Sequence, residues 1–345
     1  MITKKLSKLN RGDKVAILSP SFAAPGKWPH VHELGLKRLQ EDFGLIPVEY
    51  PTTRKLGATG DERAGDLVAA FSDPDIKAVI ATIGGDDQVT YIKNLPSKVF
   101  AQNPKPFFGY SDNSHLCNFL FLNGIPSYYG GSLFTQYAMQ GAMDEYTVKY
   151  LKYALFGEGE FELLPSDTYN EQGLSWEDES NLAKHRTHEP SEGWHWDGTQ
   201  DAAGTLWGGC VESVDEMLRH NTPIPTLEQF EGIVLMFETS EEIPTADSVF
   251  RFFRALGERG ILGRAQAVLI GRPKAWEFNK QKSPEERTTY RTAQRETILK
   301  AVRQCNQTIP IVQNLNFGHT DPQIPMPYGN SVKINSTTKQ IFATF

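Results

Sequence analysis

The chain has 345 residues, of which 39% are hydrophobic and 22% are charged, an ordinary globular balance that suggests about two domains. Its 35 Lys and Arg against 42 Asp and Glu give a net charge of -7, and no dense basic cluster offsets this charge. Nucleic acid and anionic membrane are therefore not expected partners. The basic N-terminus lacks the apolar stretch of a signal peptide, and no run approaches the roughly 20 apolar residues of a membrane span. The three cysteines are too few and too far apart for a disulfide framework, which favours a cytoplasmic protein.

The first half of the chain alternates strand and helix signals. Apolar runs predict strands at 15–18, 46–50, 78–83 and 106–110, and helical spacing or capping signals predict helices at 31–43, 61–71 and 112–122. Runs that are apolar on both faces indicate a parallel sheet covered on both sides. Ligands bind such sheets at the carboxyl ends of the strands, where Gly84-Gly85 and Ser111 fall.

The character of the chain changes between residues 160 and 200. This stretch is rich in Glu, Asp, His and Trp and has little periodicity, so we expect a linker or active-site loop at 161–200 between an N-terminal domain, 1–160, and a C-terminal domain, 201–345. Strands are expected in the second half at 232–238, 265–271, 309–312 and 331–335, with helices at 247–256 and 285–304. The polar stretch 272–295 has no evident role.

Phe107-Phe-Gly-Tyr-Ser111-Asp112 places a serine on the turn between a strand and a helix. Such a turn can expose the hydroxyl, while the next N–H and the helix N-terminus stabilise an oxyanion. The alternative is that Ser111 or Asp112 only caps the helix, and the pattern lacks the second glycine of the G-x-S-x-G turn.

Two further groups follow buried strands. Gly84-Gly85 would let the backbone approach a ligand and free N–H groups to donate, although on local sequence alone a plain glycine turn is the better explanation of the pair. Asp86 and Asp87 lack the further ligands of a metal site. Glu238 ends an apolar strand, so it needs a partner, either a helix N-terminus or a histidine that it orients. Glu241 and Glu242 are expected in the first turn of the next helix.

The histidines offer more than one candidate base. His319 lies in a glycine-proline loop, a position that favours function over core packing. His115 follows Ser111 by four residues on the expected helix and is the competing base. The irregular spacing of His185, His188 and His195 is a weak metal signal.

Five motifs, taken together and in this order, resemble the LD-carboxypeptidase family of serine peptidases. They are Phe71-Ser-Asp-Pro74 before the strand ending at Gly85, Gly109-Tyr-Ser-Asp112, Leu206-Trp-Gly-Gly209, Phe237-Glu238 and Gly318-His-Thr-Asp-Pro322. The resemblance runs from about residue 12 to 329 and is strongest to the microcin C immunity subgroup. It implies an α/β fold, with a flavodoxin-like or amidotransferase-like parallel-sheet N-terminal domain and a smaller β-rich C-terminal domain, commonly in a homodimer.

Carried over by position, the resemblance makes Ser111 the nucleophile, His319 the general base and Glu238 its orienter, without a metal or cofactor. The backbone of Asp112 and of Gly85 or Asp86 would form the oxyanion hole. The expected substrate is a peptidyl- or aminoacyl-nucleotide cleaved at an amide bond, and Trp194 or Trp196 could stack on its base or simply pack the loop. The alternatives are a murein tetrapeptide LD-carboxypeptidase and a non-catalytic ligand-binding protein.

Overall fold

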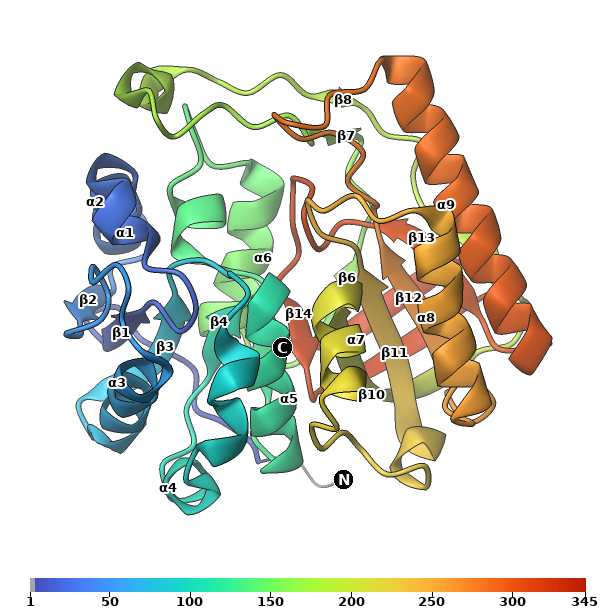
Figure 1. Ribbon diagram of the computed structural model, residues 1–345, viewed down its shortest axis with the longest axis horizontal. Coiled ribbons are helices and arrows are strands. Elements are labelled where there is room, and N and C mark those ends of the chain that lie inside the picture. Colours follow the sequence, from blue (N-terminus) through green and yellow to red (C-terminus); the bar gives the residue numbers. More distant parts are fainter. Residues whose placement is uncertain (1–3) are drawn as a thin grey trace.

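The computed structural model describes residues 4–345, which form two sheets placed side by side with helices around them (Figure 1). The first sheet has the strand order β14-β5-β4-β3-β1-β2. Its strands are β1 (Lys14–Leu18), β2 (Ile46–Glu49), β3 (Ile76–Ala81), β4 (Phe107–Gly109), β5 (Ser127–Tyr129) and β14 (Met326–Tyr328). All pairs are parallel except β14 with β5.

Helices lie on both sides of this first sheet, as its doubly apolar strands require (Figure 1). They are α1 (Ala24–Lys27), α2 (Pro29–Glu41), α3 (Gly60–Ser72), α4 (Ser97–Gln102), α5 (Ser114–Leu122) and α6 (Glu145–Phe156). The start of α3 shows why the sequence is helical there. Thr59 accepts a hydrogen bond from the Glu62 N–H, and the Glu62 side chain accepts one from the Thr59 N–H in return, which is a capping box.

The second sheet has the order β6-β16-β15-β10-β11-β12-β13-β9. Its centre, β10 to β13, is parallel, and antiparallel strands flank it. Its strands are β6 (Glu160–Leu163), β9 (His195–Asp197), β10 (Ala202–Cys210), β11 (Ile233–Glu238), β12 (Ala267–Gly271), β13 (Ile311–Leu315), β15 (Ser331–Asn335) and β16 (Gln340–Thr344), and its helices are α7 (Val211–Arg219), α8 (Ala246–Glu258) and α9 (Pro284–Cys305).

This architecture confirms the predicted α/β class, with a parallel sheet in the N-terminal region and a second sheet in the C-terminal region. The sheets exchange chain segments across the expected boundaries, because β14 joins the first sheet while β6 and β9 join the second. The limits at residues 160 and 200 therefore stay a prediction.

The segment 161–200 leaves the second sheet at β6, and its middle part crosses the top of the molecule in Figure 1 between the side of α2 and that of α9; it is called the crossing segment below. It is not a plain loop, since it contains β9 and a short antiparallel pair of β7 (Thr168–Tyr169) with β8 (Glu189–Pro190). The buried carboxylate of Glu171 holds it, accepting from Arg287 at 2.8 Å and Arg291 at 2.7 Å. Within the stretch 272–295, these arginines of α9 thus anchor the crossing segment.

No helix within residues 4–345 combines the length and apolar character that crossing a membrane would require.

Candidate active site

The carboxyl edges of the two parallel sheets meet, and Ser111 lies at this junction. β4 ends at Gly109, and Ser111 opens the short helical turn 111–113 that leads into α5. Its φ is 65°, a left-handed conformation that costs a non-glycine residue about 1–2 kcal/mol. Neither Ser111 nor Asp112 caps α5 with its side chain. Strain without capping is typical of a turn that presents a nucleophile.

The glycine pair after β3 lies against this turn. A Cβ on Gly84 would come within 2.8 Å of the Ser111 Cβ and 3.0 Å of its Oγ, so only glycine fits there. The Asp112 carboxylate holds the same loop by accepting from the N–H groups of Asp87, at 3.2 Å, and Gln88, at 3.1 Å. Asp112 therefore fixes the loop beside the serine.

Glu238 ends β11 and is buried opposite Ser111. Its Oε2 lies 2.6 Å from Nδ1 of His319, and its Oε1 accepts from the Tyr129 hydroxyl at 2.6 Å. Gly318, with φ of 96°, makes room for this pair, because a Cβ there would lie 2.5 Å from Oε2. Of the two partners that the sequence left open for Glu238, a helix N-terminus or a histidine, the structure places the histidine against it.

Tyr129, at the end of β5, connects the two halves of the site. Its hydroxyl accepts from the Ser111 N–H at 3.1 Å while donating to Glu238. Burial, reinforced by the Glu238 charge, raises the pKa of Tyr129 well above 10.0, so the phenol keeps its proton. Tyr129 was not predicted as a site residue, although it ends a parallel strand at the same sheet edge as Ser111.

His319 is buried between its carboxylate partners and the turn of the serine. Its ring packs edge-on against that of Tyr110, with centroids 5.0 Å apart. Its Nε2 lies 3.1 Å from Oε2 of Glu241, which precedes α8 and does not belong to its first turn as expected. Burial lowers the pKa of His319, but the carboxylates of Glu238 and Glu241 outweigh burial and hold this pKa well above 6.5. In this arrangement Glu241, and not Ser111, is the partner of Nε2.

The competing base, His115, points elsewhere. It is buried on α5, and its Nε2 lies 3.6 Å from Asp112 Oδ1 and 3.3 Å from Glu216 Oε2. In the described chain neither ring nitrogen forms a hydrogen bond. The histidines of the crossing segment do not converge: His188 pairs with Asp144, and His195 pairs with Glu192.

The predicted aromatic contacts pack on the second sheet. Trp194 donates from Nε1 to Asn316 Oδ1 at 3.0 Å, close to the loop of His319, and Trp196 lies in β9, paired with Val312. A second aromatic group, Phe22, Trp28, Phe134 and Trp176, was not anticipated. This aromatic group lies next to the Gly84-Gly85 loop, because the Phe22 N–H donates to the Gly84 carbonyl.

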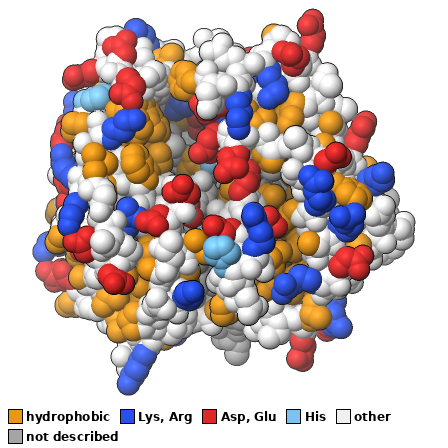
Figure 2. Space-filling model, viewed as in Figure 1, with side chains coloured by type: hydrophobic (Ala, Val, Ile, Leu, Met, Phe, Trp, Pro, Cys, Tyr) orange, Lys and Arg blue, Asp and Glu red, His pale blue; other side chains and the backbone are white. Residues whose placement is uncertain are grey.

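The surface around this junction is acidic. Figure 2 shows Asp and Glu side chains gathered along a hollow at the centre of the face seen in Figure 1. Just beyond Glu238, the Glu212 carboxylate accepts from the N–H and hydroxyl of Ser240 at 3.1 and 2.8 Å, and burial raises the pKa of Glu212. A ligand that enters this hollow meets several carboxylates.

A serine turn and a carboxylate-bound histidine at the meeting edges of two parallel sheets are features of α/β hydrolytic enzymes. The chain belongs to the LD-carboxypeptidase family: residues 15–130 match the family's N-terminal domain and residues 203–334 its C-terminal domain. The resemblance inferred from sequence is thereby confirmed, and the protein is a hydrolase of the serine carboxypeptidase type.

Relatives match over nearly the whole chain. YocD of Bacillus subtilis, named as a carboxypeptidase, is 26% identical over 96% of this chain and 95% of its own length. The microcin C7 self-immunity protein MccF of Escherichia coli is 22% identical over 96% of this chain and 93% of its own. A B. subtilis protein named as a murein peptide carboxypeptidase is 24% identical over 97% and 92%.

Solved structures agree with the fold. An MccF-like protein from Streptococcus pneumoniae in complex with AMP has a TM-score of 0.84 at 27% identity, covering 97% of this chain and 99% of that one. MccF in complex with aspartyl sulfamoyl adenosine also has a TM-score of 0.84, at 20% identity, covering 99% and 98%.

Proposed function

We propose that this protein is a serine peptidase or amidase in which Ser111, His319 and Glu238 form a catalytic triad. The observation that carries the proposal is the continuous contact from the Ser111 N–H through the Tyr129 hydroxyl to Glu238, which binds Nδ1 of His319. A carboxylate on Nδ1 leaves Nε2 as the nitrogen that can take a proton from a serine.

The reaction proceeds by acyl transfer. Substrate displaces Glu241 from His319 Nε2, which then removes the Ser111 proton as Oγ attacks the scissile carbonyl. The imidazolium gives that proton to the leaving amine, and water hydrolyses the acyl-enzyme. The backbone N–H of Asp112 and that of Gly85 or Asp86 stabilise the oxyanion; this assignment is supported by the place of the glycine loop against the serine turn.

The substrate we propose is a peptidyl- or aminoacyl-nucleotide of the microcin C type. It is supported by the AMP complex of the S. pneumoniae neighbour and by MccF, a relative over nearly the full length. The base would stack on an aromatic side chain. Trp194 or Trp196 is the position predicted from sequence, and the group around Trp28 and Trp176 is a second position close to the glycine loop. Compartment and assembly, a cytoplasmic homodimer, belong to the same proposal.

The relatives named as carboxypeptidases favour a second substrate class, a murein tetrapeptide cleaved at its L,D bond. Purified enzyme should be given an aminoacyl sulfamoyl adenosine and a muropeptide tetrapeptide in parallel, with Ser111→Ala as the control. Loss of all hydrolysis in Ser111→Ala, together with phosphonate labelling of the wild type at Ser111, supports the triad. Wild-type activity in Ser111→Ala would refute it, and ligand binding without labelling or hydrolysis would identify a binding protein.

A further inference from the structure

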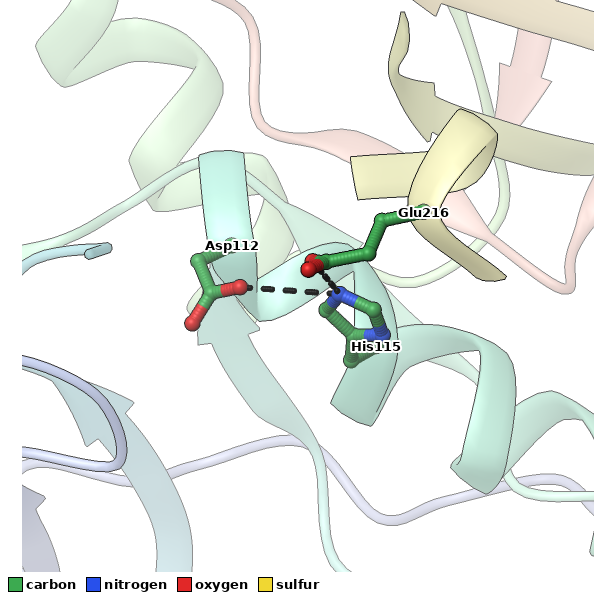
Figure 3. Close-up of side chains that lie close together, drawn as sticks. All are labelled: Asp112, His115 and Glu216. Atoms are coloured by element: carbon green, nitrogen blue, oxygen red, sulfur yellow. Dashed lines mark ion pairs between the residues drawn. The ribbon is translucent and has the colours of Figure 1, made fainter. Parts of the chain in front are cut away.

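Behind the serine turn, three side chains from both halves of the molecule converge on one point. Figure 3 shows Asp112 from the helical turn 111–113, His115 from the start of α5 and Glu216 from α7, with the imidazole between the two carboxylates. One ligand atom of each lies within 4.8 Å of the others. This is the one such group of three potential metal ligands in the described range, 4–345.

Hydrogen bonding does not explain this arrangement. His115 is only 1% exposed, yet neither ring nitrogen has a hydrogen-bond partner in the described chain. A buried imidazole normally has a partner for at least one nitrogen. Its Nε2 is instead aimed between Asp112 Oδ1, at 3.6 Å, and Glu216 Oε2, at 3.3 Å.

The two distances from Nε2, 3.6 and 3.3 Å, are close to the edge length of a zinc coordination shell. Tetrahedral Zn²⁺ with bonds of about 2.0–2.1 Å has ligand atoms about 3.3 Å apart. One neutral imidazole and two carboxylates are a suitable donor set, and they leave a fourth position for water. We propose that Asp112, His115 and Glu216 bind a Zn²⁺ ion that ties the serine turn to α7.

Charge and access support the site. Two carboxylates face one imidazole here, and a divalent cation such as Zn²⁺ would neutralise the negative charge that such a donor set gathers. The Glu216 side chain is 31% exposed, which gives an ion a route from solvent.

The supporting contacts of Asp112 favour a role in holding the turn. Its Oδ2 accepts the N–H groups of Asp87 and Gln88, leaving Oδ1 for the ion, as expected of a ligand held by a second layer of hydrogen bonds. The ion would connect the glycine loop, the serine turn and α7. The reaction at Ser111 does not pass through it, so the zinc site does not depend on the proposed substrate.

Zinc binding to the full chain tests the proposal. Wild type, Glu216→Gln and His115→Gln are loaded with Zn²⁺, dialysed, and compared by metal analysis and by competition with a chromophoric chelator. Asp215→Asn is the matched control, because it removes a carboxylate from the same helix that pairs with Arg219 outside the cluster. Wild type and the control should retain one more equivalent of Zn²⁺ than the two cluster variants.

Zn²⁺ should also raise the Tm of wild type and control by several degrees, and of Glu216→Gln by much less. X-ray absorption should show a mixed shell of one imidazole nitrogen and oxygens. Zinc held by other histidines contributes equally to all four proteins and cancels. Glu216 is partly exposed, so Glu216→Gln should fold normally. This variant therefore tests the zinc site even if His115→Gln fails to fold. Equal retention by wild type and Glu216→Gln, or a shell without imidazole, would overturn the site.

Discussion

Replacing Glu241 with Gln should move the acidic limb of the pH–rate profile to lower pH. In the resting structure His319 lies between two carboxylates, Glu238 on Nδ1 and Glu241 on Nε2. Both stabilise the imidazolium, whereas the proposed reaction needs the neutral ring as base. Removing one carboxylate destabilises the charged form, so the pKa of His319 falls and the base becomes available at lower pH.

The size of the shift follows from distance and exposure. The charge of Glu241 lies 3.1 Å from Nε2, and its side chain is 53% exposed, so water screens it strongly. Coulomb's law with the dielectric constant of water gives about 1.3 kcal/mol at that distance, or about one pKa unit. The limb should therefore shift by about one pH unit, and kcat/KM well below the limb should rise about tenfold.

The assay is the pH dependence of kcat/KM, which reports the pKa values of the free enzyme. Glu242→Gln is the matched control, because it removes an adjacent charge without an ion pair to His319, and its limb should move by a small fraction of that amount. NMR titration of the His319 ring in both variants provides a readout independent of turnover. An unshifted limb in Glu241→Gln with a shifted ring titration would show that His319 is not the base. Two unchanged profiles would show that the Glu241 contact does not form in solution.

Three further results are expected. Tyr129→Phe leaves a buried oxygen of Glu238 without its hydrogen-bond donor, so a denaturant titration should give a free energy of unfolding that is lower by about 1–3 kcal/mol. In the same variant kcat should fall by a larger factor than KM changes, and an unchanged kcat would contradict the bridging role of Tyr129. Gly318→Ala puts a Cβ 2.5 Å from Glu238 Oε2 at a positive φ, so activity and Tm should both fall, and a fully active variant would mean that the loop sits differently. Stacking of a base on an aromatic side chain contributes about 1–3 kcal/mol. Either Trp194→Ala or Trp176→Ala should therefore raise KM for the nucleotide substrate about 5- to 150-fold and leave KM for a muropeptide unchanged. Equal KM values in all variants would place the base elsewhere.

The parts of the site that follow sheet geometry could be predicted from sequence. Ser111 and Gly84 each come directly after an apolar run, and parallel strands bring their carboxyl ends to one edge. Glu238 could be recognised by the cost of a charge at the end of such a strand. Pairing Glu238 with His319, 81 residues later, required the family resemblance, because no local pattern links them.

Other features had no readable local signal. β9 is a strand only because it pairs with β13, more than a hundred residues further along the chain. Tyr129 resembles any core aromatic at the end of a short strand. Glu241 was misplaced because acids before a helix resemble a first turn, whereas α8 is capped by Thr245, whose side chain accepts from the Ser248 N–H. The three residues before that cap leave Glu241 free to reach His319.

The site exists only where the two sheets are joined, and this explains the number of polar contacts across the junction. The N-terminal sheet supplies the hydroxyl and the C-terminal sheet supplies the base with its carboxylate, so neither half alone contains both. Apolar packing could hold the halves together but would not fix the position of a serine to within a few tenths of an ångström. Directional bonds can, and Tyr129 to Glu238 and Ser114 Oγ to the Cys210 N–H, at 3.0 Å, both cross the junction next to the serine turn. A substitution at either contact should therefore impair catalysis more than its effect on stability alone would suggest.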